Sequence, residues 1–517
     1  MTETTYLLWL LFIPLVISLL IFAARWFGRA SRFIVILLHL MSTTLVLVFS
    51  LLIVWYVLAA GQVLGLSDGL QVDALGAVFL LIVGVLGFLI GLYSVGYTHH
   101  DLQTGVFDTQ KFCNYYGLFS LFLFTLLLIV TANNIIMMWV AVEAATLGSA
   151  FLVGIYGGRA SLEAAWKYLI ICVVGEAFGL YGTVLVYSGA FNIMQIPANA
   201  ALWTEIIKNA SAFDPAMIKM AFVFVLVGFG TKAGLFPMHA WVPDAYSESP
   251  APISALLSAV FGSCALLVIL RFSILTNLVL GPSFVQALFL VFGTISVGAA
   301  AFFMFGQRDL KRLLAYSSIE NMGFVLIAFG LGGAVGIFAG LLQTLNQGLV
   351  KCLLWCASGN ILIKYHGRDL ERVKGMLQAI PATGLLMIVG ALAIIGTPPF
   401  NIFISKFLIV AAGLQTGYIW LMLLCLLLLM VVFATFFRFV AAMLFGKKPD
   451  DVDSGESNWL TLFPGFVLLL LIVGLGLFIP SQLTTLLKGA SNVVLTGNPK
   501  TVAAAKDILL PLAHLLP

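Results

Sequence analysis

Long apolar runs separated by short polar segments recur from one end of the chain to the other. The runs cover about 6–24, 33–58, 72–96, 113–131, 135–156, 163–189, 218–238, 251–272, 284–305, 313–332, 334–363, 382–412, 418–445 and 459–487. Helices are expected here because lipid offers no hydrogen-bond partner to an exposed backbone amide. Since about 20 apolar residues suffice for one helical crossing, the pattern predicts an all-α polytopic membrane protein with about 14 transmembrane helices.

The composition supports the same conclusion. Of the 517 residues, 62% are hydrophobic and 9% are charged, and the mean hydropathy is +1.13. A soluble domain carries about a quarter charged residues. Soluble enzymes, nucleic-acid binders and disordered scaffolds are therefore excluded.

Lysine and arginine gather in alternate loops. With the N-terminus outside, the inner loops hold fifteen of these residues, and the outer loops hold three: Lys208, Lys219 and Arg271. Because short cytoplasmic loops are enriched in basic residues, we expect both termini on the outer side of a prokaryotic cytoplasmic membrane.

The cysteines do not indicate a redox centre. All six lie scattered in apolar stretches, and none belongs to a CxxC pair. Cys352 and Cys356 share a helix face, for which small apolar packing is the favoured interpretation. No metal-ligand spacing appears either, so we expect no cofactor and no metal on this chain.

The informative residues are the charged ones inside the apolar runs. Four basic residues remain there, namely Lys232, Lys351, Lys406 and Arg438. Among the acids, Glu143 and Glu176 lie deep in apolar sequence, whereas Glu320 is placed at the start of a helix. A charge at the centre of a transmembrane helix costs about 2.5–3.5 kcal/mol on insertion scales, and such residues commonly mark ion or proton paths.

Two of these lysines lie beside helix-breaking residues. Lys232 precedes Pro237, and Lys406 follows Pro398 and Pro399. Interrupted helices in corresponding halves of a chain are typical of an internal repeat in a transporter. His239 follows Lys232 by seven residues, which is two turns along one helix face, so it joins the candidates.

A buried lysine releases its proton more readily when a nearby carboxylate moves away, because that carboxylate stabilises the ammonium. Glu143 and Lys232 would form such a switch, and Lys351 and Lys406 could pass the charge onward. Static ion pairs or lysines reaching to an interface are the alternative. Glu176 stays open between a role in the pathway and local pairing near Lys167. Arg271 and Arg438 lie near helix ends, where reaching out to the interface is the expectation.

Several segments resemble the antiporter-like subunits of respiratory complex I and of group 4 membrane-bound [NiFe] hydrogenases. They are Trp139–Glu143, Lys232–Pro252, Asp309–Ser318, Lys351–Gly359 and Pro398–Lys406. The resemblance covers almost the whole chain, and residues 361–376 and 398–406 look most like hydrogenase-4 component F.

This resemblance implies two inverted five-helix repeats, helices 4–8 and 9–13, with helices 7 and 12 discontinuous. The implied units are residues 1–112, 113–272, 284–445 and 446–517. By position, Glu143 is the helix-5 glutamate, Lys232 the helix-7 lysine, Lys351 the helix-11 lysine and Lys406 the helix-12 lysine of an exit path. The implied partners are other membrane subunits and a peripheral redox arm, which would hold any [NiFe] centre, iron–sulfur clusters or quinone.

The chain departs from the family pattern at three secondary candidates. Ser263 stands where the family has a helix-8 lysine, and Gln343 and Gln347 stand where many relatives have histidine. Transfer between Lys232 and Lys351 would then need water or amide bridges.

The sequence thus predicts a proton-translocating membrane subunit of a complex I-related redox complex, not catalytic on its own. A subunit of a multisubunit sodium/proton antiporter is one alternative. A non-pumping membrane anchor is the other, although no Tyr/His/Asp group suggests a quinone site.

Overall fold

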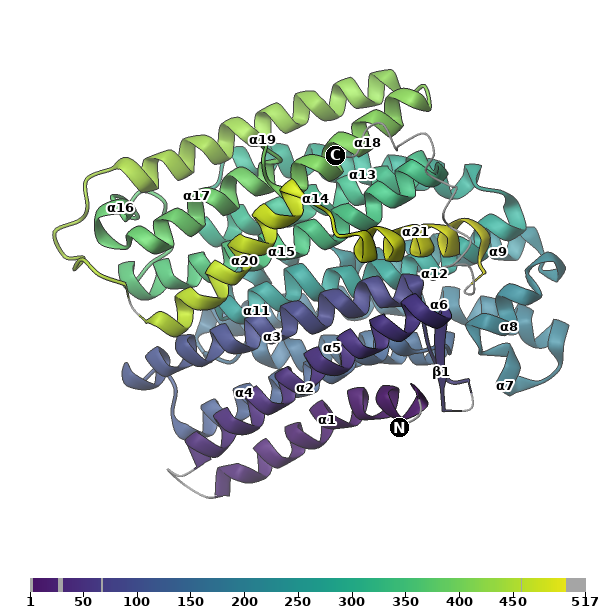
Figure 1. Ribbon diagram of the computed structural model, residues 1–517, viewed down its shortest axis with the longest axis horizontal. Coiled ribbons are helices and arrows are strands. Elements are labelled where there is room, and N and C mark those ends of the chain that lie inside the picture. The colour runs from purple at the N-terminus through teal and green to yellow at the C-terminus, as the bar shows by residue number, and fades with distance from the viewer. Residues whose placement is uncertain (1–2, 27–30, 67, 457, 499–517) are drawn as a thin grey trace.

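The computed structural model describes residues 3–26, 31–66, 68–456 and 458–498, and its helices run side by side along one direction (Figure 1). Among these residues, thirteen helices are long and apolar enough to cross a membrane. Two shorter apolar helices, α17 (Pro381–Ile395) and α18 (Asn401–Gln415), follow each other in the expected run 382–412. The prediction of an all-α polytopic membrane protein is confirmed.

The bounds of the elements follow the expected runs closely. The N-terminal part comprises α1 (Glu3–Ala24), α2 (Ser31–Ala60), β1 (Gln62–Gly65), β2 (Leu70–Asp73) and α3 (Ala74–Gln103). The next part comprises α4 (Thr109–Thr131), α5 (Ile135–Val153), α6 (Arg159–Met194), α7 (Pro197–Ala200), α8 (Trp203–Lys208), η2 (Ala210–Ala212), α9 (Pro215–Ala233), α10 (Val242–Glu248), α11 (Ala251–Ala255), a π-helical turn η3 (Leu256–Phe261) and α12 (Gly262–Leu280). The remainder comprises α13 (Ser283–Phe305), α14 (Leu310–Leu331), α15 (Gly333–Tyr365), α16 (Met376–Ala379), α17 (Pro381–Ile395), α18 (Asn401–Gln415), α19 (Ile419–Phe445), α20 (Trp459–Leu477) and α21 (Ser481–Thr496).

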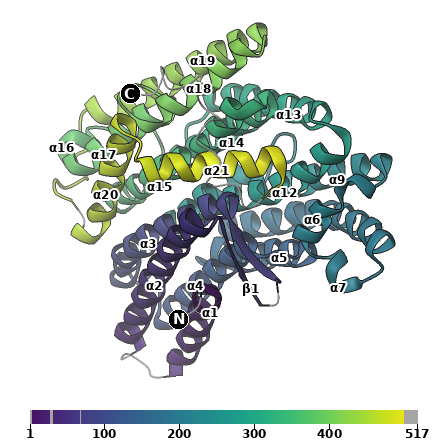
Figure 2. The same ribbon diagram turned by 45° about the vertical axis from the view of Figure 1, so that its right-hand side comes forward.

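The bundle has a buried centre and two opposite edges. Helices α1 and α2 form one edge and α18 and α19 the opposite one (Figure 2). The crossings formed by α12, α14 and α15 are the most buried of the described spans. A long central helix surrounded by protein can carry polar side chains that a lipid-facing helix cannot.

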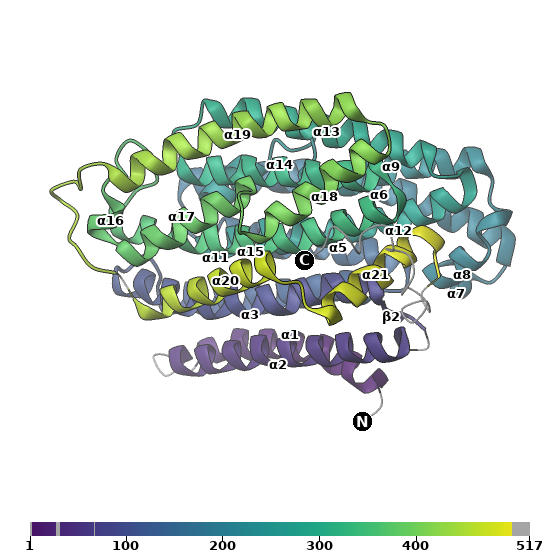
Figure 3. The same ribbon diagram turned by 45° about the horizontal axis from the view of Figure 1, so that its top comes forward.

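Two features of the fold differ from the expectation. The run 459–487 is not one helix: α20 ends at Leu477, and α21 begins after Pro480 and packs against α3 and α15 (Figure 3). Proline removes a backbone donor and disfavours helix in the preceding residue, so the apolar run outlasts the helix. The antiparallel hairpin β1–β2 was also not expected. The apolar tail from Ala503 to Leu516 lies outside the described residues.

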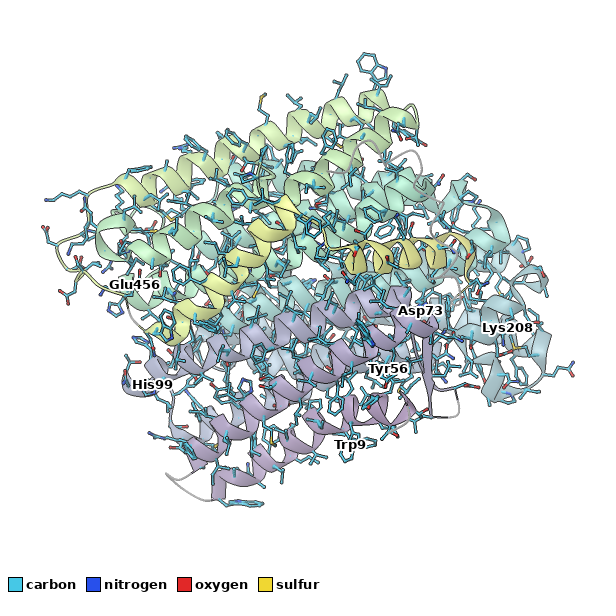
Figure 4. All side chains as sticks on the ribbon, in the orientation of Figure 1. Trp9, Tyr56, Asp73, His99, Lys208 and Glu456 are labelled. Carbon is cyan, nitrogen blue, oxygen red and sulfur yellow. The ribbon has the colours of Figure 1, made fainter. Side chains whose placement is uncertain are left out.

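Helix ends and loops at one end of the bundle form a charged network. Asp244 accepts from Arg312 and pairs with Lys167, while Arg368 contacts Glu248 and Asp309. Figure 4 shows His99 and Glu456 at this end and Lys208 at the other. The first described residues lie at the same end of the bundle as Lys208, because Thr4 donates a hydrogen bond to the Leu64 carbonyl. The last residues of α21 also lie at that end, because Gly497 packs beside Ile207. Which membrane face this is stays a prediction.

Arg271 does not reach out to an interface as expected. Its two terminal nitrogens contact the carboxylate of Asp73 at 2.5 and 2.7 Å, and its guanidinium lies 4.4 Å from the ring centre of Trp203. Asp73 also caps the start of α3 by accepting from the backbone of Gly76 at 2.8 Å. Burial makes solvent unavailable to the guanidinium, and the carboxylate replaces it.

Helices α6 and α9 approach each other backbone to backbone. A Cβ atom on Gly228 would lie 2.3 Å from the backbone nitrogen of Gly179, and one on Gly175 would lie 2.7 Å from Thr231. Small residues permit such contact between transmembrane helices. This approach places Glu176 of α6 beside Lys232 of α9.

We expect Asp73→Leu to lower stability by about 3–5 kcal/mol, because it leaves the Arg271 guanidinium buried without a carboxylate. The measurement is thermal unfolding of the purified protein in detergent. Asp450→Leu is the control, since Asp450 is almost fully exposed and pairs loosely with Lys447. Equal unfolding temperatures for the two variants would contradict the expectation.

Gly228→Ala should lower the unfolding temperature, whereas Gly148→Ala should leave it unchanged or raise it. Both changes gain about 1 kcal/mol of helix propensity. Only the first places a methyl group against another backbone, because nothing lies within 4 Å of a Cβ atom on Gly148. A stabilised Gly228→Ala protein would show that α6 and α9 can separate without loss.

Candidate functional site

Lysines and glutamates that the sequence leaves inside apolar helices gather in two buried groups. The first group is Lys232 with Glu143, Glu176 and Thr146, from α9, α5 and α6. The second group is Lys351, Lys406 and Glu320, from α15, α18 and α14. All three lysines are at most 4% exposed. Each group therefore holds cations that protein atoms, rather than bulk water, must stabilise.

In the first group, Lys232 is shared between two carboxylates. Its Nζ lies 3.9 Å from Oε2 of Glu143 and 3.8 Å from Oε1 of Glu176. Nζ donates its one short hydrogen bond, 2.5 Å long, to Oγ1 of Thr146, which lies three residues after Glu143 on the same face of α5. Glu176 thus belongs to this group, while Lys167 pairs with Glu163 and Asp244 instead.

The break in α9 explains why a lysine is tolerated there. Helix α9 ends one residue after Lys232, and Gly234 adopts a left-handed conformation with φ of 75°. The indole of Trp241 donates a hydrogen bond of 2.8 Å to the freed Thr231 carbonyl. A cation in the last turn of a helix interacts favourably with the partial negative charge of the unpaired carbonyls.

Several carboxylate oxygens of the first group accept no hydrogen bond within the described part of the chain. Oε2 of Glu143 and both side-chain oxygens of Glu176 accept no hydrogen bond from the described residues. The Glu143 side chain is 21% exposed, against 1% for Glu176 and 0% for Lys232. A buried carboxylate needs hydrogen-bond donors, so these oxygens are suited to water or to a partner's side chain.

In the second group, Lys406 is fully engaged. Its Nζ lies 3.0 Å from Oε1 of Glu320 and donates to the carbonyls of Ile394 and Ile395 at 3.2 and 3.4 Å. Those carbonyls end α17, where Gly396 turns the chain with φ of 94°. As in the first group, the lysine contacts the carbonyl end of a broken helix.

Lys351 has weaker partners. Its Nζ reaches the Ser318 carbonyl of α14 at 3.5 Å. Ser318 precedes by two residues Glu320, the acid that Lys406 contacts. The two buried lysines therefore approach the same stretch of α14.

Glu320 does not start a helix as expected from the sequence. It is the eleventh residue of α14, 1% exposed, and its second oxygen accepts from the Asn321 amide. The expected repeats contain a signal for a buried glutamate at this position. Helix α14 is the second helix of the second repeat, and α5, which carries Glu143, is the second helix of the first. The interior of a 22-residue apolar helix is an expensive place for a carboxylate without a partner.

An amide and hydroxyl network connects the helices around Glu320. Gln343 donates to Asn321 at 2.9 Å and accepts from Ser405 at 2.6 Å. Asn346 donates to Ser405 at 3.2 Å and accepts from Asn401 at 3.1 Å. Gln343 therefore lies in the second group and not between the groups.

Gln347 and two serines occupy the region where α15 packs on α11–α12. Both amide atoms of Gln347 and the hydroxyl of Ser258 lack hydrogen-bond partners among the described residues, although all are buried. The hydroxyl of Ser263 donates only to its own helix, to the Ala259 carbonyl at 3.0 Å. Helix α15 contacts the π-helical turn here, since a Cβ atom on Gly348 would lie 3.5 Å from that carbonyl.

His239 does not continue the face of α9. The helix ends at Ala233, so His239 lies in the turn before α10, half-buried beside the rings of Phe236, Phe303 and Tyr316. The prediction that His239 and Lys232 share one helix face is therefore wrong, because the helix ends between the two residues. Arg438 is exposed near the end of α19.

Metal-binding groups are not found in the described part of the chain: no three or more His, Cys, Asp or Glu side chains converge on one point. The six cysteines are buried and make no disulfide. The lysine and glutamate side chains of both groups can perform acid–base chemistry.

Comparison with known proteins agrees with this arrangement. Residues 132–432 match the family described as NADH:quinone oxidoreductase/Mrp antiporter, TM, and residues 55–107 match NADH-Ubiquinone oxidoreductase (complex I), chain 5 N-terminus. The chain is 37% identical over 413 residues to a "Hydrogenase-4 component F homolog" of Methylacidiphilum infernorum. The aligned region covers 80% of this chain and 86% of the relative.

Solved structures share the fold. A chain of the membrane-bound sulfane sulfur reductase, an archaeal respiratory membrane complex, superposes with a TM-score of 0.84 at 23% identity, covering 98% of this chain and 100% of that one. A chain of the Mrp complex from Dietzia sp. DQ12-45-1b gives a TM-score of 0.83 at 17% identity, with the same coverage. The predicted resemblance is confirmed, and the chain belongs to the NADH:quinone oxidoreductase/Mrp antiporter family as an antiporter-like membrane subunit.

Proposed function

We propose that this chain translocates protons as a membrane subunit of a complex I-related redox complex of the hydrogenase type. The observation that carries the proposal is the position of Lys232, fully buried and shared between two carboxylates of which one reaches the surface. A static ion pair is best served by one carboxylate in close contact. Two distant carboxylates on one ammonium suit a group whose partner changes.

Glu143 provides the link to a neighbouring subunit. Its side chain is the accessible member of the first group, and the exposed apolar residues Val140 and Leu147 lie one turn before and one turn after it on α5. A charge brought up by a partner, or the withdrawal of Glu143, changes the stabilisation of Lys232. Breaking a buried ion pair from one side is worth about 3–5 kcal/mol, enough to expel a proton.

The released proton then passes to the second group. Gln347, Ser258 and Ser263 contain no group that titrates near neutral pH, so they can relay a proton only by ordering water. The free amide of Gln347 and the free hydroxyl of Ser258 supply donors and acceptors for that water. Lys351 and Lys406 then carry the proton to the far side.

The remaining parts of the proposal concern the complex. Redox cofactors, whether a [NiFe] centre, iron–sulfur clusters or quinone, belong to partner subunits in a peripheral arm. The charged network at one end of the bundle faces the cytoplasm, and both termini face outward, in keeping with the positive-inside rule. The two expected repeats, residues 113–272 and 284–445, each contain one of the buried groups.

Lys232→Ala should reduce redox-driven proton translocation about tenfold or more, because the first proton carrier is lost. The measurement is proton uptake per electron by inside-out vesicles holding the tagged complex. Lys219→Ala is the matched control, since Lys219 lies exposed on the same helix. A Lys232→Ala complex that assembles and pumps normally would leave only the role of membrane anchor.

Gln347→Leu should slow proton translocation several-fold without weakening the complex. The side chain has no hydrogen-bond partner to lose, and replacing an unsatisfied amide by an apolar group is neutral or stabilising. Gln347→His, which restores a titratable group, should pump at least as well as the parent. Gln378→Leu, on an exposed position, serves as the control. Unchanged pumping in Gln347→Leu would exclude a water relay at this residue.

Sodium/proton exchange is the alternative function, favoured by the similarity to a chain of the Mrp complex. The same vesicles decide between the two. Proton uptake that requires sodium on the opposite side supports the antiporter, whereas uptake that requires only the electron donor supports the redox pump.

A further inference from the structure

The two buried groups use the same residue types in opposite states. In the first group the ammonium lies nearly 4 Å from both of its carboxylates. In the second, Lys406 and Glu320 are in contact at 3.0 Å, and Nζ has two further carbonyl acceptors. In the first group no carboxylate contacts the ammonium, which we call an open pair, and in the second group the carboxylate contacts it, which we call a closed pair.

Counting charges in the second group shows what Glu320 must do. Lys351, Lys406 and Glu320 are all at most 4% exposed. Lys406 contacts Glu320 at 3.0 Å, and Lys351 contacts the carbonyl of Ser318, two residues before Glu320 on α14. Two ammonium ions beside one carboxylate would leave a net positive charge in a medium of low polarity, which is strongly disfavoured. One carboxylate therefore stabilises one proton on the two lysines.

The contacts of the two lysines indicate that Lys406 carries the shared proton in the structure. Lys406 contacts Glu320 and the carbonyl end of α17, whereas Lys351 contacts a single carbonyl at 3.5 Å. Lys351 is thus the lysine from which the proton has moved on, or to which the next proton must come.

We propose that Glu320 is the shared counter-charge of Lys351 and Lys406, so that one proton at a time passes from the first lysine to the second. The step balances as a proton transfer: the Lys351 ammonium gives a proton, through water or a hydroxyl, to the neutral Lys406 amine. Release from Lys406 to the far side leaves Glu320 uncompensated, and its charge draws the next proton onto Lys351. This inference rests on the proposed proton translocation and adds the residue that sets its stoichiometry at the exit.

The amide network holds Glu320 in place for this task. Asn321 donates to one carboxylate oxygen, and Gln343 and Ser405 hold Asn321 against α18. Because amides and hydroxyls do not titrate in this range, the network orients the carboxylate without competing for the proton.

The test is Glu320→Gln in the complete complex, a change that keeps shape and removes the charge. We expect proton uptake per electron to fall about tenfold or more. Glu371→Gln, at an exposed glutamate in a loop, should have no effect. Glu320→Asp keeps the charge and should retain proton uptake with an altered pH profile. This variant provides the test if Glu320→Gln does not assemble. An unchanged pH profile in Glu320→Asp would contradict the proposal.

Double-mutant cycles separate a shared counter-charge from a static pair. Glu320→Gln combined with Lys351→Gln, and separately with Lys406→Gln, should both deviate from additivity by about fivefold or more. Deviation with Lys406→Gln alone would make Glu320 a fixed partner of that lysine and overturn the inference. Loss of pumping in Lys232→Ala with normal pumping in Glu320→Gln would refute this inference and leave the proposed function intact.

Discussion

The need to stabilise an ammonium group away from water governs the architecture of this protein. Lys232 and Lys406 each lie at the carbonyl end of a helix that stops inside the bundle, after Ala233 in one case and after Ile395 in the other. A continuous helix would leave no carbonyl free at that depth. The breaks, their glycines and their prolines are therefore part of the charge chemistry and not defects in the helices.

The same requirement shapes the packing. Glycines at the α6–α9 contact bring a carboxylate to within reach of Lys232, and the fully buried α15 places Lys351 among α14 and α18. A transmembrane helix that faces protein on all sides can carry amides, hydroxyls and a lysine, because its neighbours supply partners that lipid cannot. The lipid-facing helices α1 and α19 carry almost none of these groups.

The sequence predicted much of this and missed what depends on tertiary contact. Hydropathy located the helices, and the lysines and Glu143 stood out because charge is rare in such segments. Asp73 and Arg271 are 198 residues apart, so nothing local marks them as a pair, and the helix-end position of Arg271 suggested solvent instead. His239 was misplaced because the periodicity of α9 was continued past a glycine that ends the helix. Glu320 is not at a helix start, because α14 begins ten residues before it, and only the contact with Lys406 from α18 shows why a carboxylate is tolerated there.

In the proposed path, the neutral residues Gln347, Ser258 and Ser263 determine how a proton passes from one buried group to the other. A titratable side chain at Gln347 would hold a proton of its own and link the two groups directly. An amide cannot store the proton, so the proposed transfer requires ordered water to bridge the gap. The Lys232 ammonium lies 3.9 Å from Glu143, whereas Lys406 contacts Glu320 at 3.0 Å. In the proposed path, a proton that reaches Lys351 therefore meets an acid that already pairs with Lys406, and it would be stabilised there only after Lys406 has released its own proton.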